Sequence, residues 1–105
     1  MEDDGFLDEV ENAIKLYEAV TGYPATRTRQ MIAKYGVIAA ISRLVNSSDL
    51  QKGFTALRDT NQLDFSFEAL VVKYCDFFDT NTVTAAKWRL AHPFDLFLKK
   101  GNLHY

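Results

Sequence analysis

The sequence predicts an all-α protein, a compact orthogonal bundle of about five to six short helices. Apolar residues recur at three- and four-residue steps along most of the chain, as they do on the buried face of a helix. Short polar breaks separate these segments, which is typical of helices that turn back on one another. No segment alternates convincingly as a half-buried strand does. The 105 residues correspond to a single domain, with residues 1–5 and 101–105 expected to fray.

The first helix is expected over residues 6–21, with Asp3 or Asp4 as its cap. Its apolar positions follow helical spacing: Leu7, Val10, Ala13, Ile14, Tyr17 and Val20. Gly22 can adopt the left-handed conformation that closes a helix, and Pro24 then prevents a simple continuation.

The second helix is expected over residues 25–35, with Thr26 as a plausible N-cap and Gly36 as its end. Residues 37–45 follow and have the composition of a buried strand. Their apolar positions, however, have helical spacing, and two alanines together with a Ser-Arg pair favour a helix.

A further helix is expected to begin near Ser48, because Ser48 and Gln51 have the spacing of a capping box. Its apolar stripe is Leu50, Phe54 and Leu57, and Gly53 inside it makes the helix depend on packing. Asp64 or Ser66 can cap the next helix, which extends through Tyr74, although Val71-Val72 leave a strand as the competing interpretation.

The last full helix is expected over residues 83–91, after the polar break 79–82 and before His92-Pro93. One or two helical turns are expected in the tail that begins at Phe94.

Composition excludes several classes of protein. The chain is 48% hydrophobic and contains eight Phe, five Tyr and one Trp, which is too apolar for a disordered chain. The single cysteine cannot form an internal disulfide, so we expect a cytoplasmic protein. The acidic N-terminus is unlike a signal peptide, and no apolar run approaches the roughly 20 residues that span a membrane. Six of the 14 acids precede residue 12, where they suit the start of a helix.

Residue types that serve in catalysis or metal binding are present, but they lie far apart in the sequence. A thiol mechanism would need Cys75 with His92 or His104 and with Asp76 or Asp79, but no motif surrounds the cysteine, and we expect it to be a small buried residue. His92, Asp95 and His104 could form at most a weak metal site. We therefore expect no cofactor and no enzymatic activity.

Two sets of residues are candidates for binding. Aromatic residues that the helical stripes do not absorb would suit a partner protein, and we assign this surface to Tyr23, Trp88, Phe94 and Phe97. The alternative is a nucleic-acid-associated domain that contacts phosphates near the start of the second helix, through Arg27, Arg29 and Lys34. A net charge of −2 and a pI of 5.6 make nucleic acid the second choice. One of these bases could instead pair with the acidic first helix.

The chain resembles small helical units that recur in uncharacterised bacterial proteins, some standing alone and some attached to larger restriction- or defence-type proteins. The residues that carry the resemblance are 22–26, 30–32, 35–40, 44–45, 48–54, 57 and 62–71. It implies a bacterial cytoplasmic accessory or protein-interaction domain and assigns no catalytic residue.

Overall fold

The computed structural model describes residues 3–47 and 51–94, and within them the chain is helical without a strand. This confirms the all-α fold class. Six α-helices are found: α1 (Asp3–Thr21), α2 (Thr26–Tyr35), α3 (Val37–Val45), α4 (Gln51–Asp59), α5 (Phe67–Lys73) and α6 (Thr80–Ala91). Two 3₁₀ turns, η2 (Leu63–Phe65) and η3 (Cys75–Phe77), flank α5.

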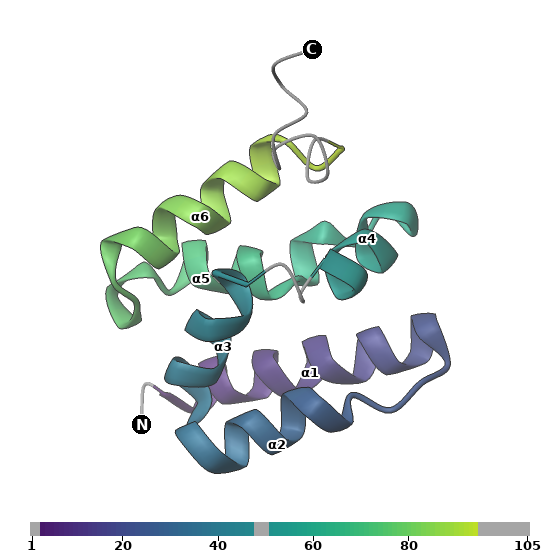
Figure 1. Cartoon of the computed structure of the whole chain (residues 1–105), viewed down its shortest axis with the longest axis horizontal. Coiled ribbons are helices and arrows are strands. Elements are labelled where there is room, and N and C mark those ends of the chain that lie inside the picture. The colour runs from purple at the N-terminus through teal and green to yellow at the C-terminus, as the bar shows by residue number, and fades with distance from the viewer. Residues whose placement is uncertain (1–2, 48–50, 95–105) are drawn as a thin grey trace.

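The helices pack in crossed layers (Figure 1). The long α1 lies against α4 and α5, α2 packs against α3, and α6 covers the other side of α5. Every α-helix except α2 contributes buried residues to the core between them, and the loop residue Ala25 before α2 is buried as well. The buried residues include Phe6, Val10, Ile14, Ile41, Leu44, Val45, Phe54, Leu57, Leu70, Val71 and Ala86. The apolar stripe predicted for α1 is therefore mostly buried, with Leu7 as an exception described below.

Short side chains and glycines set the helix ends. Gly22 and Gly36 have φ of +77° and +88°, and each donates its N–H to the last turn of the preceding helix. The Ser66 hydroxyl caps α5 by accepting the Ala69 N–H at 3.1 Å, and the Asp79 carboxylate caps α6 by accepting the Thr82 N–H at 2.7 Å.

Several predicted boundaries need correction. Thr26 is the first residue of α2 and not its cap, because Ala25 occupies the cap position. The N–H of Ala25 donates a hydrogen bond to Glu18 Oε2 at 2.7 Å. The last helix begins at Thr80 and not at Val83, because Asp79 caps it.

At the other boundaries, Ser66 and not Asp64 caps α5, since Asp64 lies in η2. Residues 3–5, expected to fray, belong to α1. The capping box at Ser48, the helical turns of the tail and the terminal residues 101–105 lie outside the described residues.

A buried ion pair joins α5 to α6. Arg89 donates to Glu68 Oε2 at 3.0 Å and to the Ser47 carbonyl at 2.7 Å, and the Glu68 side chain is only 1% exposed. Burial raises the pKa of Glu68, against the opposing effect of the Arg89 charge.

No helix in the described part of the chain is long and apolar enough to cross a membrane.

Candidate interaction groove

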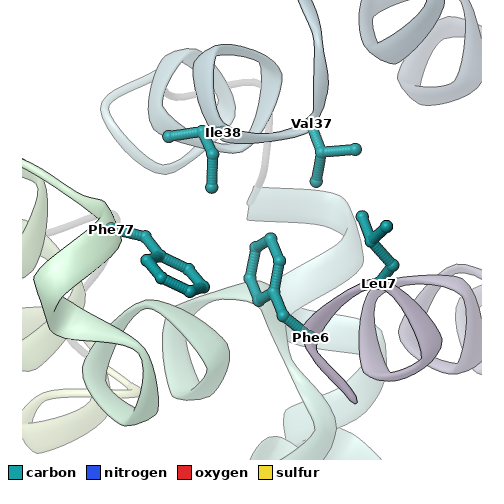
Figure 2. Close-up of a pocket in the computed structure, with 5 residues that line it drawn as sticks. All are labelled: Phe6, Leu7, Val37, Ile38 and Phe77. Atoms are coloured by element: carbon teal, nitrogen blue, oxygen red, sulfur yellow. The ribbon is translucent and has the colours of Figure 1, made fainter. Parts of the chain in front are cut away.

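An apolar groove with a volume of about 420 Å³ lies where the starts of α1 and α3 meet η3. Figure 2 shows the five side chains that line it, with Val37 and Ile38 of α3 facing the side chains from α1 and η3 across the opening. The lining residues are Phe6, Leu7, Val37, Ile38 and Phe77. We call this site the apolar groove.

The local sequence explains how these side chains reach the groove. Phe6 and Leu7 are neighbours in α1, and helical geometry turns them about 100° apart. Phe6 therefore lies in the core at 2% exposure, while Leu7 stays 44% exposed at the rim. On the other side, the positive φ of Gly36 ends α2 and lets α3 start at once, which places Val37 and Ile38 at the groove.

Two rings that line the groove, Phe6 and Phe77, belong to a cluster of aromatic rings that we call the aromatic wall. Phe6 makes edge-to-face contacts with Tyr74, Phe77 and Phe78 at centroid distances of 5.0, 5.2 and 6.1 Å. Tyr74 stacks on Phe77 at 5.7 Å. These contacts fix the wall of the groove to the core.

A polar network anchors this cluster from α1. The Tyr74 hydroxyl donates to Glu9 Oε2, and Lys73 Nζ lies 3.0 Å from both carboxylate oxygens of Glu9. These hydrogen bonds, that of Tyr74 first, lower the pKa of Glu9, and the Glu9 carboxylate raises the pKa of Tyr74. The carboxylate is thus held ionised next to the aromatic wall.

None of the described side chains that line the groove offers a group for acid, base or nucleophilic chemistry. Its five described lining side chains are all hydrocarbon. The nearest acids in sequence are Asp8, next to Leu7, and Asp76, next to Phe77, and both are exposed.

The predicted aromatic surface is dispersed over different parts of the fold. Tyr23 and Phe94 are 71% and 72% exposed, and the Arg58 guanidinium lies 4.7 Å from the Phe94 ring. Trp88 is half-buried and stacks on His92 at 4.4 Å, and Phe97 lies outside the described residues. Tyr23, Trp88 and Phe94 are not among the described residues that line the apolar groove. The sequence did not single out Leu7 or Ile38, since both have the spacing of core residues.

The predicted phosphate-contacting set is divided by ion pairs between α1 and α2. Arg29 binds Glu18 Oε1 at 3.0 Å and Glu11 at 3.1 Å, so one of the bases does pair with the acidic first helix. Arg27 is exposed in the first turn of α2, and Lys34 Nζ lies 5.2 Å from the Tyr35 ring. Arg29 is therefore engaged with two carboxylates while its side chain stays 41% exposed, and its role as a phosphate contact stays a prediction.

The Glu18 interactions predict a pH dependence of stability. Hydrogen bonds from Arg29 and from the Ala25 N–H lower the pKa of Glu18 below 4.5. A carboxyl whose pKa is lower in the folded protein than in the unfolded chain stabilises the fold at pH values above the unfolded-chain pKa. This stabilisation is lost as the pH falls through the pKa of the folded protein. Glu18→Gln should therefore lower Tm at pH 7, and its difference from the wild type should shrink as pH falls below 4.5.

Thermal unfolding of both proteins between pH 7 and about pH 3 checks this prediction. Asp64→Asn, which removes an exposed acid from η2, is the matched control and should follow the wild type at every pH. A Glu18→Gln difference that stays constant with pH would contradict the assignment.

The residues considered for catalysis do not assemble. Cys75 is exposed in η3, and the expectation that it is buried is wrong, because the 3₁₀ turn after Tyr74 directs it away from the core. Its Sγ lies 4.0 Å from Asp76. His92 is beyond the far end of α6, with Nδ1 2.9 Å from the Trp88 carbonyl. Residues 3–47 and 51–94 contain no group of three side chains that could hold a metal ion, and Asp95 and His104 lie outside them.

The fold thus defines an all-α helical bundle with an apolar groove. Comparison with protein-family models, with curated proteins and with solved structures found no match.

Proposed function

We propose that the protein is a helical protein-interaction or accessory module that binds a partner protein through the apolar groove. The observation that supports this most is the exposure of Leu7 and Ile38, 44% and 36%, at the rim of a groove whose five described lining side chains are hydrocarbon. Exposed apolar side chains around a concave surface are typical of sites that bind another protein.

The occupant that fits is the apolar face of a basic amphipathic helix. Such a helix places side chains at positions i, i+3, i+4 and i+7 into a groove between helices. The neighbouring Asp8 and Asp76 are exposed and would attract Lys or Arg on the flanks of that helix. In this proposal the protein works in a bacterial cytoplasm, as the resemblance implies, and carries out no reaction itself.

Selection of helical peptides from a displayed library on the wild-type protein tests the proposal. The selected peptides should carry apolar residues at helical spacing on one face and basic residues on the flanks of that face. Leu7→Asp and Ile38→Asp should each weaken their binding by about tenfold or more, because each places a charge against an apolar helix face. Circular dichroism of each variant reports whether the bundle remains folded.

Phe65→Asp is the control, because Phe65 is 58% exposed on η2 and does not line the groove. It should leave peptide binding unchanged. If Tyr23→Asp and Phe94→Asp abolish binding while the groove variants bind normally, the interaction surface is the aromatic one and the groove proposal fails. Failure to select any peptide would also reject it.

The nucleic-acid alternative stays a prediction. With Arg29 engaged by Glu11 and Glu18, it depends on Arg27 and Lys34. A gel-shift experiment with DNA and RNA at about 50 mM salt checks it, since phosphate contacts weaken as salt rises.

A further inference from the structure

One side of the apolar groove is carried by a very short element. Val37 and Ile38, which face Phe77 across the opening (Figure 2), belong to the nine-residue helix α3. Phe77, in contrast, ends η3, a 3₁₀ turn of three residues. Such a turn has poorer hydrogen-bond geometry than an α-helix, so its position depends on the side chains around it. The place of the Phe77 ring, and with it the width of the groove, therefore depends on what holds η3.

Tyr74 holds Phe77 in two ways. Its carbonyl accepts the Phe77 N–H at 2.9 Å, which closes the 3₁₀ turn. Its ring stacks on the Phe77 ring at a centroid distance of 5.7 Å and an interplanar angle of 14°. A shift of Tyr74 is therefore expected to move the backbone and the ring of Phe77 together.

Glu9 fixes Tyr74 from α1. The Tyr74 hydroxyl donates a charge-assisted hydrogen bond to Glu9 Oε2. Lys73 Nζ also lies 3.0 Å from both Glu9 oxygens, but its side chain is 60% exposed, so this ion pair contributes less. Glu9 follows Phe6 by three residues, which places both on the same side of α1. That side of α1 thus supplies a ring that lines the groove and the carboxylate that holds the turn carrying Phe77.

We propose that Glu9 is a positioning residue of the apolar groove: it holds Tyr74, and through Tyr74 it sets the place of the Phe77 ring and the width of the groove. Glu9 is not among the described residues that line the groove, so it acts through Tyr74. This role rests on the proposed function, because a groove of fixed width gives a partner a preformed site and reduces the entropy lost on binding. The width of the groove can nevertheless be tested without a partner.

NMR of the free protein with labelled methyl groups tests the position of the Phe77 ring. The methyl groups of Val37 and Ile38 face this ring, so their chemical shifts report its ring current. Tyr74→Phe removes only the hydroxyl and Glu9→Ala removes the carboxylate, and both should shift these methyl signals. The double variant should shift them no further than Glu9→Ala alone, because both substitutions break the same hydrogen bond. Unchanged signals in Glu9→Ala, or additive shifts in the double variant, would overturn the proposal.

Glu18→Ala is the matched control. It also removes one carboxylate from α1, where Glu18 binds Arg29 of α2 and accepts the Ala25 N–H. It should lower Tm, as Glu9→Ala does, but leave the methyl signals at the groove unchanged. If Glu9 only stabilised the bundle, the two variants would be alike at the groove, and equal methyl shifts in both would reject the positioning role. Circular dichroism reports whether each variant is folded.

Titration with indole, a small apolar probe, extends the test to binding. Indole should give saturable methyl shifts at Val37 and Ile38 in the wild type and in Glu18→Ala, and bind about fivefold more weakly to Glu9→Ala and Tyr74→Phe. Wild-type affinity in both of these variants would overturn the positioning role and leave the groove as a binding site. Absence of indole binding to the wild type would count against the proposed function, while the methyl signals of the free protein still decide the role of Glu9.

Discussion

Arg89→Met should lower the free energy of unfolding by about 3–5 kcal/mol at pH 7, because it leaves the Glu68 carboxylate buried without its partner. A domain of this size is stabilised by roughly 5–15 kcal/mol in total, so the loss is a large fraction. Urea unfolding measures it. The double variant Glu68→Gln/Arg89→Met should recover much of the lost free energy of unfolding, since an amide costs less to bury than a carboxylate.

The cost of Arg89→Met should depend on pH. Burial raises the pKa of Glu68 above 4.5, and removing Arg89 also removes the charge that opposes this rise. Below the pKa that Glu68 has in the unfolded chain, its carboxyl is protonated in both the folded and the unfolded protein. As the pH rises above that pKa, ionisation of Glu68 favours the unfolded chain. The deficit should therefore be small near pH 4 and largest near neutral pH. Lys87→Met, on the exposed side of the same helix, should have little effect, and an equal deficit at both pH values would contradict this account.

Phe6→Ala should destabilise the bundle by about 3–5 kcal/mol, because it removes a side chain that is 2% exposed and leaves a cavity. The variant also loses edge-to-face contacts with three rings of the aromatic wall. Urea unfolding at neutral pH measures the loss.

The neighbouring residue supplies the control for Phe6. Leu7→Ala removes a side chain that is 44% exposed and should cost less than about 1 kcal/mol, while it weakens peptide binding at the apolar groove. A Phe6→Ala variant as stable as Leu7→Ala would show that Phe6 is not a core residue.

Local signals in the sequence account for most of the fold. Helical spacing over 37–45 outweighed the strand-like composition and correctly predicted α3. Gly22, Gly36 and Ser66 are found at the helix ends where their conformational and capping preferences place them. The start of α6 was missed because Asp79 is one of four consecutive polar residues, and spacing cannot choose among possible caps.

The surface was predicted less well, because exposure depends on which helices meet. Leu7 has the spacing of a core residue, yet α3 and η3 leave a gap above it. Glu68 follows Ser66 in the first turn of α5, where an acid is usually solvated, and only the arrival of Arg89 from α6 explains its burial. Cys75 was expected to be buried, but α5 ends at Lys73 and Cys75 begins η3, where it is exposed.

The position of α1 in the chain has a consequence for synthesis on the ribosome. α1 is translated before residues 73–78, but Phe6 packs against Tyr74, Phe77 and Phe78, and Glu9 binds Lys73 and Tyr74. While residues 73–78 are still inside the exit tunnel, the apolar stripe of α1 has none of these partners. The nascent chain must therefore keep this stripe from aggregating until residues 73–78 have left the tunnel.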